Sequence, residues 1–348
     1  MDEIVVIGHP SKYGGADTEL DHQIHVWQAL GMRVHLIHTG PLDERLRAMR
    51  MAEDRGCVVH EPRDWRQVRG RVVISYCNGQ FLEALAEIRS HEPRAILWVN
   101  CMTWLFPREK EAHEAGLIDW FLYQTEAVRK KVAPELAGLN PQLNQAVVDP
   151  YFDASRFAFL PDKPTDRFRF CRISREDLGK FHESQLWIYE TMTAPNPKEG
   201  TILGVNDAVR EKLTGGPKGE RVMPDWIRAL PAGAEPVEEV YRRSHALIMM
   251  ADPSLSENLP RVGFEAMATG TVLCVDDRGG WRDEVVPGET GFLCGDPREF
   301  VYRASRLAWE PEERRQLAEK ARDHLSTRWG LEASKASWAA FFRRVASK

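Results

Sequence analysis

The sequence predicts an α/β fold made of two doubly wound domains, and three observations carry this prediction. Short apolar runs alternate with amphipathic stretches along most of the 348 residues, as in parallel strands connected by helices. The alternation weakens around 148–159, where Pro161 and Pro164 then mark a linker. A second alternation starts at Phe168 and continues to Leu293. We therefore expect three parts, a first domain, a second domain and a final helix: 1–158, 165–328 and 329–348.

The first domain begins with a buried strand, Ile4–Gly8, that ends at His9. A polar loop with Gly14 and Gly15 follows, and it lacks the GxGxxG pattern of dinucleotide-binding proteins such as dehydrogenases and epimerases. A helix is expected from about Asp17 to Leu30, because apolar residues recur on one side of it: Leu20, Ile24 and Trp27. Further short apolar runs predict strands at Arg33–Ile37, Cys57–His60, Val72–Ser75, Ala95–Val99 and Trp120–Tyr123.

The clearest unit of the second domain is a strand, a loop, a helix and a second strand. Apolar runs at Ala246–Ala251 and Thr271–Val275 are typical of buried parallel strands. Between them, Pro260 suits the first helical position and Gly270 suits the residue just past the helix end. The last third of the chain is predicted to be helical, in three segments: Arg298–Trp309, Pro311–Trp329 and Leu331–Ala346.

Two glutamates of this unit, Glu257 and Glu265, stand eight residues apart. We expect one on the loop at the carboxyl end of a strand and the other in the first turns of the next helix. Free backbone N–H groups at that helix start attract anions. A ligand with hydroxyls at both ends and phosphate in the middle, such as a nucleotide sugar, fits this site. Spacing alone favours two solvated glutamates on an amphipathic helix, but the surrounding sequence reverses that preference.

The surrounding residues resemble the retaining family 4 glycosyltransferases of the GT-B fold. The resemblance is carried by a glutamate, seven residues and a second glutamate in a characteristic frame: Pro253–Ser254, Glu257, Glu265, Ala266–Met267–Ala268 and Gly270. A glycine-punctuated tail follows in the same order: Gly279–Gly280, Glu284, Gly288, Thr290, Gly291, Phe292 and Leu293. The chain departs from the family at Asn258–Leu259–Pro260–Arg261, where Gly-Phe-Gly is usual. The resemblance implies two Rossmann-like domains that face a central cleft, with the last helix crossing back to the first domain.

The resemblance also implies an activity, the transfer of a hexose from a nucleotide diphosphate-sugar to a hydroxyl with retained configuration. Glu257 would hold the sugar hydroxyls and Glu265 the ribose, while Arg172 and Lys180 would stabilise the diphosphate. Arg175 could replace one of these two cations, because their spacing is longer than usual in the family. The loop residues of the altered segment would also contact the donor: Asn258, Leu259 and Arg261. For the cations, a surface loop of solvated charges is the alternative.

No Asp-x-Asp occurs anywhere in the chain, so we expect no bound metal. We also expect no cofactor besides the donor itself. For the donor, a UDP-sugar is favoured over a GDP-sugar. The resemblance suggests roles in the first domain as well. Gly14 and Gly15 resemble the family's glycine loop over the donor, although a flexible loop is the simpler interpretation. Asn100 stands where the family commonly has a histidine, and His9 could take that role unless it merely caps its strand. Asp17 and Trp104 are weaker candidates on the acceptor side.

The acceptor is left open between a glycan, a small molecule and modified DNA. A local cluster of arginines permits a polynucleotide such as hydroxymethylated DNA: Arg63, Arg66, Arg69 and Arg71. Four tryptophans in this half could stack on sugars or bases, although such rings are more often core: Trp65, Trp98, Trp104 and Trp120. The last helix leaves a lipid-linked acceptor possible. A protein that binds nucleotide sugar without turnover is the alternative from another class.

Composition limits the possible partners of the chain and its expected location in the cell. The net charge of −5 gives no global basic surface for nucleic acid. No apolar segment approaches the length of a membrane span, and no signal peptide is evident. The six cysteines form no CxxC and no zinc spacing, so we expect reduced, buried thiols and a cytoplasmic protein.

Overall fold

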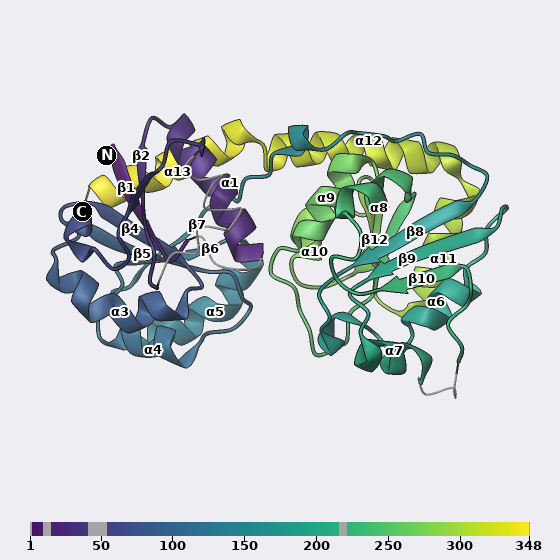
Figure 1. The fold of residues 1–348 in the computed structure, drawn as a ribbon, viewed down its shortest axis with the longest axis horizontal. Helices are drawn as coiled ribbons and strands as arrows, with labels where there is room; N and C mark the ends of the chain where they lie inside the picture. Colours follow the sequence, from purple (N-terminus) through teal and green to yellow (C-terminus); the bar gives the residue numbers. More distant parts are fainter. Residues whose placement is uncertain (1, 10–14, 41–53, 216–220, 348) are drawn as a thin grey trace. The chain divides into compact units, whose positions relative to one another are not determined.

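The computed structural model describes residues 2–9, 15–40, 54–215 and 221–347, and the chain divides into two compact units (Figure 1). Unit 1 contains Met1–Asp153 together with Trp329–Lys348, and unit 2 contains Ala154–Arg328. The first boundary therefore lies earlier than the expected position 158. The segment that we expected to be a linker belongs to unit 2.

Unit 1 is built on a seven-stranded sheet with the order β3-β2-β1-β4-β5-β6-β7. Every pair of neighbouring strands is parallel. The strands are short and mostly buried: β1 Glu3–Ile7, β2 Arg33–Ile37, β3 Val58–His60, β4 Val72–Tyr76, β5 Ala95–Asn100, β6 Trp120–Tyr123 and β7 Asn144–Val147. The polar edge strand β7 has no apolar run, which is why the sequence did not indicate it.

Helices cover both faces of this sheet (Figure 1). One face packs on α1 (Gly15–Ala29) and on α13 (Leu331–Ala346). The other face packs on the 3₁₀ turn η1 (Trp65–Val68) and on three helices: α3 Gly79–Ser90, α4 Pro107–Glu114 and α5 Glu126–Leu139. Apolar residues of each strand alternate between these two cores, as the pleat requires.

The C-terminal helix α13 packs into unit 1, as the GT-B resemblance implied. Trp338 is fully buried, and its ring packs edge-on against Trp27 of α1 with centroids 5.2 Å apart. Its indole N–H donates to the side-chain oxygen of Gln23 at 2.5 Å. Phe341 packs beside it against Trp120 of β6. An amphipathic helix at the end of the chain thus completes a core that begins at residue 4.

Unit 2 is built on a six-stranded parallel sheet with the order β10-β9-β8-β11-β12-β13. Its strands are β8 Phe168–Ile173, β9 Lys198–Leu203, β10 Ile227–Leu230, β11 Ala246–Met249, β12 Val272–Asp276 and β13 Gly291–Cys294. Its helices and 3₁₀ turns are η2 Ala154–Arg156, η3 Leu178–Lys180, α6 Gln185–Thr191, α7 Asp207–Thr214, α8 Val237–Arg243, α9 Arg261–Thr269, α10 Trp281–Glu284, α11 Pro297–Trp309 and α12 Pro311–Arg328. Both sheets follow doubly wound orders.

The helix between the two expected strands of unit 2 is α9, and its ends are close to the predicted positions. Pro260, which we expected at the first helical position, is instead the N-cap residue in an extended conformation, and the helix begins one residue later at Arg261. Gly270 ends it in the left-handed region, with φ 77°. A side chain is disfavoured in this conformation, which explains the glycine.

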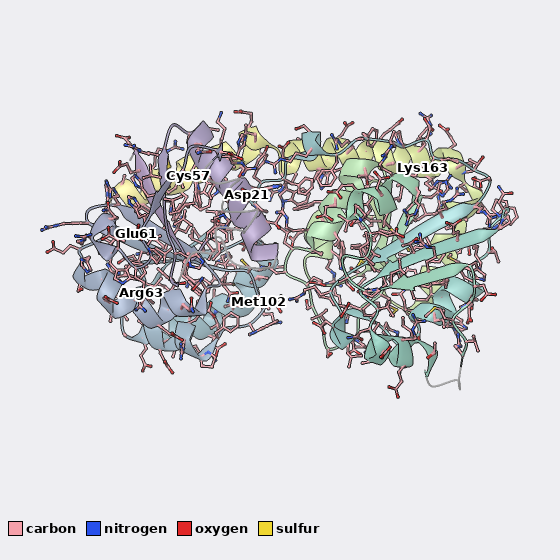
Figure 2. The ribbon with its side chains drawn as sticks, viewed as in Figure 1. Asp21, Cys57, Glu61, Arg63, Met102 and Lys163 are labelled. Atoms are coloured by element: carbon pink, nitrogen blue, oxygen red, sulfur yellow. The ribbon has the colours of Figure 1, made fainter. Side chains whose placement is uncertain are left out.

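The segment before β8 is fixed to unit 2 by a buried lysine, Lys163 (Figure 2). Its ammonium donates to the carbonyls of Tyr241 and Thr269 at 3.1 and 3.4 Å and to the hydroxyl of Thr271 at 3.2 Å. Burial lowers the pKa of Lys163 to about 7. These contacts hold the expected linker segment around Lys163 against unit 2.

Two expectations from composition can also be compared with the structure. All six cysteines have free thiols, but Cys57, Cys77 and Cys101 are only half-buried, so the expectation of burial was wrong for them. Within the described part of the chain, no helix combines the length and the apolar character needed to cross a bilayer.

Replacement of Trp338 by alanine should destabilise unit 1 by about 3–5 kcal/mol, because the change removes a fully buried indole and leaves a cavity. Urea unfolding followed by near-UV circular dichroism measures this loss. Ala336→Ser, at an exposed position of the same helix, is the control and should change stability by less than about 0.5 kcal/mol. Equal stability of both variants would show that α13 does not belong to the core of unit 1.

Candidate functional site

The candidate site lies at the carboxyl edge of the unit 2 sheet. Three loops meet there, which follow β8, β11 and β12, because the carboxyl ends of parallel strands share one edge. The first residues of α9 continue the loop after β11. In doubly wound sheets ligands bind at this edge.

Lys180 and Glu257 meet at this edge, although they are far apart in the sequence. The Lys180 ammonium forms an ion pair with Oε1 of Glu257. Both side chains are mostly shielded, with 15% and 17% exposed. η3 carries the lysine and the loop before α9 carries the glutamate. The structure thus brings together a predicted cation and a predicted carboxylate in one pair.

Arg172 contacts the loop that carries Lys180 and does not present its own charge to the surface. Its side chain is fully buried, and its guanidinium lies 3.6 Å from the centroid of the Phe181 ring. One nitrogen donates to the Ser174 hydroxyl at 2.8 Å and another to the Lys180 carbonyl. Burial lowers the pKa of Arg172 to about 10. The expected direct contact of Arg172 with a diphosphate therefore does not fit the structure; the arginine orients the Lys180 loop.

A second lysine, Lys212 of α7, ties η3 to the loop after β11. It donates to the Leu178 carbonyl at 3.0 Å and pairs with the Asp252 carboxylate at 2.6 Å. These contacts and the Ser254 hydroxyl hold the pKa of Asp252 well below its usual range. The backbone N–H of Asp252 in turn donates to the Gly179 carbonyl at 3.0 Å. Sequence analysis missed Lys212, because nothing near it in the sequence marks a site.

The glycine pair Gly279–Gly280 positions the Glu257 loop by allowing close backbone approach. The N–H of Gly280 donates to the Glu257 carbonyl at 2.8 Å. A Cβ on Gly279, which has φ 55°, would lie 2.5 Å from that same carbonyl oxygen, and one on Gly280 would overlap the Asn258 carbonyl. Both positions therefore require glycine for steric reasons, and Gly279 also requires it for its positive φ.

Glu265 lies in α9 with its carboxylate near Tyr241 of α8. The Tyr241 hydroxyl is 3.3 Å from Oε2 of Glu265 and 3.1 Å from the Val262 carbonyl. Burial raises the pKa of Glu265 to about 7, whereas Arg261 and the Tyr241 hydroxyl act in the opposite direction. An acceptor with such a pKa changes its charge near neutral pH.

Glu284 is a buried carboxyl group that we did not predict as a site residue, although it belongs to the quoted motif. It is fully buried in α10, and neither oxygen has a hydrogen-bond partner among the described residues. Burial, with Glu257 as the next cause, raises its pKa well above the usual range. It packs so closely on Gly263 that a Cβ there would overlap its oxygen. The spacing from the glycine pair was the available signal for this residue.

The remaining predicted donor residues lie around the same edge. Asn258 is buried, whereas Leu259 and Arg261 are half-buried. Arg175 is exposed on the loop after β8. Among the described residues no cluster of three or more His, Cys, Asp or Glu side chains is arranged to hold a metal.

Asn100, the predicted substitute for the family histidine, is committed to its own loop. Its side-chain oxygen accepts from the N–H of Met102 at 2.5 Å, and its amide nitrogen donates to the Trp104 carbonyl at 2.9 Å and to Glu109 at 3.3 Å. The residue is fully buried. Glu109 also accepts from the Trp98 indole, and burial raises the pKa of Glu109 to about 7. A catalytic role for Asn100 therefore does not fit the structure, because its amide is used to shape the turn after β5.

The other predicted site residues of unit 1 differ in where they lie and in how far the structure describes them. His9 is buried at the end of β1. Gly14 lies outside the described residues, Gly15 begins α1, and the side chain of Asp17 lies outside the described part. Trp104 is 46% exposed, whereas the other three tryptophans named for this half are buried in the core.

The arginine cluster of unit 1 is neutralised by carboxylates. Each arginine pairs with an acidic side chain: Arg63 with Glu87, Arg66 with Asp64, Arg69 with Glu92 and Arg71 with Glu3. Arg63, for example, lies beside α3, which carries its partner (Figure 2). These pairs reduce the positive charge of the cluster, which weighs against a basic surface for DNA there.

Comparison with known protein families finds a match for the segment that carries much of this site. Residues 228–324, which include Glu257, Glu265 and the glycine pair, match the family model of glycosyl transferases group 1. This segment is a glycosyl transferases group 1 domain. Glycosyltransferase 1 domain-containing protein 1 of Xenopus tropicalis is 32% identical over 98 residues. That match covers 28% of this chain and spans 28% of the length of the relative.

Solved structures extend the likeness to the whole chain. HepE of Anabaena, in complex with UDP and glucose, has a TM-score of 0.74 at 14% identity and covers 99% of this chain and 100% of its own. Sucrose-phosphate synthase of Thermosynechococcus elongatus has a TM-score of 0.72 at 15% identity and covers 100% of both chains. A variant of S. aureus TarM, in complex with Fondaparinux, alpha-GlcNAc-glycerol and UDP, has a TM-score of 0.74 at 9% identity and covers 98% of this chain and 100% of its own. The chain has the GT-B fold.

Gly280→Ala should lower the stability of unit 2 by about 1–3 kcal/mol, because the added methyl overlaps the Asn258 carbonyl and forces the Glu257 loop to move. Thermal unfolding measures the loss. Gly295→Ala is a matched control, since a Cβ there meets only the end of Glu299 at 3.9 Å. If both variants unfold at the wild-type temperature, the glycine pair does not fix the loop.

Proposed function

We propose that the chain is a retaining, metal-independent glycosyltransferase that moves a sugar from a nucleotide diphosphate-sugar to a hydroxyl acceptor. The observation that carries this proposal is the Lys180–Glu257 pair beside the start of α9. It joins a fixed cation, a carboxylate and a helix start at the ligand edge of a sheet. The group 1 domain supports the same class of reaction.

Each group has a distinct task in this proposal. Lys180 stabilises the negative charge that grows on the departing diphosphate, and the N-terminal N–H groups of α9 add to it. Glu257 accepts hydrogen bonds from the sugar hydroxyls, and Glu265 accepts them from the ribose diol. Arg172 holds the Lys180 loop in place through the backbone.

The bond changes follow a same-face route. The bond between the anomeric carbon and the phosphate oxygen breaks, and the acceptor oxygen bonds to the same face of that carbon. The acceptor proton passes to the leaving phosphate, so no protein base is required. The buried, fully hydrogen-bonded Asn100 supports this route, because its amide is not available to the acceptor.

The donor is proposed to be a UDP-sugar. HepE was solved with UDP and glucose, and the TarM variant with UDP, and both have the same fold as this chain. A glycan or a small molecule is the proposed acceptor class. The paired arginines of unit 1 weigh against modified DNA.

A thermal-shift screen with UDP, GDP, ADP and their sugars, followed by assays of donor hydrolysis and transfer, tests the function. In this assay Lys180→Met should lower the transfer efficiency at least tenfold, which is about 1.4 kcal/mol of transition-state stabilisation. Lys320→Met removes an exposed lysine of α12 and should leave transfer unchanged. Binding of a nucleotide sugar with neither hydrolysis nor transfer would favour the alternative, a binding protein without turnover. Absence of binding by every nucleotide would overturn both functions.

Affinity for a UDP-sugar should rise about tenfold between pH 6 and pH 8. With a pKa of about 7, the Glu265 carboxyl is mostly protonated at pH 6 and mostly ionised at pH 8, and the ionised form is the better acceptor for two hydroxyls. Isothermal titration across this range measures the change. Glu265→Gln should bind more weakly at pH 8 and show a flat profile, whereas Glu239→Gln, at an exposed position of α8, should keep the wild-type profile. A slope that persists in Glu265→Gln would assign the titration to another group.

A further inference from the structure

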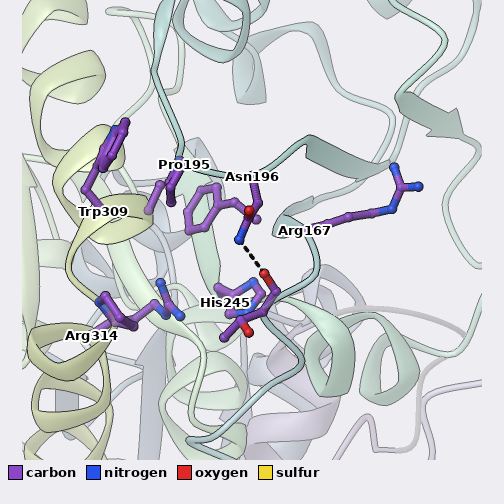
Figure 3. Close-up of a pocket in the computed structure, with 10 residues that line it drawn as sticks. Arg167, Pro195, Asn196, His245, Trp309 and Arg314 are labelled. Atoms are coloured by element: carbon purple, nitrogen blue, oxygen red, sulfur yellow. Dashed lines mark hydrogen bonds between the residues drawn. The ribbon is translucent and has the colours of Figure 1, made fainter.

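A cavity of unit 2 lies at the edge of its sheet opposite the candidate site, at the amino ends of the strands (Figure 3). Phe168 begins β8, Asn196 comes shortly before β9, and His245 directly precedes β11. The end of α11 and the start of α12 close the cavity, with Trp309 and Arg314 in its wall. Its volume is about 130 Å³, well above the ~10–15 Å³ that a cavity needs to hold one water. The candidate donor site uses none of these residues.

His245 lines this cavity, and its ring carries a hydrogen-bond donor. Only 2% of the residue is exposed. Its Nδ1 accepts from the backbone N–H of Arg169 at 2.9 Å, so the ring proton must be on Nε2. Nε2 is buried, and no described residue offers it an acceptor. Burial, followed by the charges of Arg314 and Lys163, lowers the pKa of His245 to about 3, so the ring is neutral.

Arg314 brings a cation to the same cavity without a counter-ion. It is 7% exposed, and one of its nitrogens donates to the Leu307 carbonyl at 2.6 Å. No carboxylate of the described residues forms an ion pair with it, and burial lowers its pKa to about 10. Figure 3 shows the side chain extending from α12 toward His245. Both groups contact the same ring: His245 stacks on Phe168 at 5.6 Å, and the Arg314 guanidinium lies 5.9 Å from that ring.

The charged groups around the cavity do not satisfy these two donors. The nearby carboxylates of α12 are engaged elsewhere, Glu313 with Arg306 and Glu312 with Arg315. Arg167 points away from the cavity (Figure 3). A buried cation without a partner costs several kcal/mol, and a buried N–H without an acceptor adds to that cost. A bound anion with oxygen acceptors would offset both.

From this arrangement we infer that the cavity is a binding site for a small oxyanion, held by the Arg314 guanidinium and the Nε2–H of His245. A phosphate group matches a forked guanidinium and a neighbouring N–H donor, and it can come from inorganic phosphate or from a phosphorylated metabolite. The ligand joins the first turn of α12 to the strand edge, so it stabilises unit 2 at a point remote from the donor residues.

The test is thermal unfolding of the full chain with sodium phosphate, sodium sulfate, sodium acetate and glucose 6-phosphate, each against sodium chloride at equal ionic strength. In the wild type, phosphate at ten times its Kd should raise Tm by about 3 °C. Arg314→Met should lose this response while its Tm without phosphate is equal to or above that of the wild type, because the change removes an unpaired buried charge. His245→Asn keeps an acceptor for the Arg169 N–H, removes the Nε2–H donor and should lower the affinity for phosphate at least tenfold.

Arg315→Met is the matched control, since it removes an ion-paired arginine next in sequence and should keep the phosphate response. Lys180→Met separates this site from the donor site and should also keep the response. A larger shift with glucose 6-phosphate than with phosphate identifies a metabolite as the source, and equal shifts identify the free ion. Equal responses of Arg314→Met and the wild type, or no effect of any oxyanion beyond chloride, would overturn the inference without bearing on the proposed transferase activity.

Discussion

A buried guanidinium holds the candidate site together. Arg172 uses its donors on the Ser174 hydroxyl and the Lys180 carbonyl, and its planar group stacks on Phe181. A charge in such an environment loses several kcal/mol of hydration, and this loss is offset only where geometry and hydrogen bonds are good. The loop that carries Lys180 therefore cannot move without exposing or abandoning that charge. The ion pair between Lys180 and Glu257 depends on this constraint, since it places the lysine opposite the carboxylate.

Much of the fold, and the meeting of Lys180 with Glu257, could be predicted from the sequence. Apolar runs marked the strands, and residues that follow neighbouring parallel strands must share an edge. The burial of Arg172 and the use of the Asn100 amide could not be predicted, because both depend on side chains whose positions only the folded chain defines. Phe181 covers the first, and the Trp104 carbonyl accepts from the second. A motif specifies the residue type, but not the direction in which it points.

The arginine cluster of unit 1 illustrates a related limit. In the sequence, four arginines lie within nine residues, and Asp64 is the one local carboxylate among them. The fold adds three more acids from distant positions, Glu3, Glu87 and Glu92, and the local charge disappears. Charge patterns are therefore informative about a surface only when tertiary neighbours are known. Glu284 shows the converse, since a residue type usually found at the surface is fully buried behind the Glu257 loop, where burial raises its pKa.

The two edges of the unit 2 sheet differ in how their cations are balanced. At the amino edge no carboxylate of the described residues pairs with Arg314, whose guanidinium donates to the Leu307 carbonyl, so an anion can bind without displacing an acidic partner. At the carboxyl edge Lys180 is already paired, so a diphosphate that takes the lysine deprives Glu257 of its cation. A mostly shielded carboxylate without a partner is costly, and sugar hydroxyls are the donors that can replace the lost contact. In the proposed mechanism one ion pair therefore couples binding of the diphosphate to binding of the sugar. A nucleotide without its sugar gains less binding free energy from Lys180 than the complete donor does.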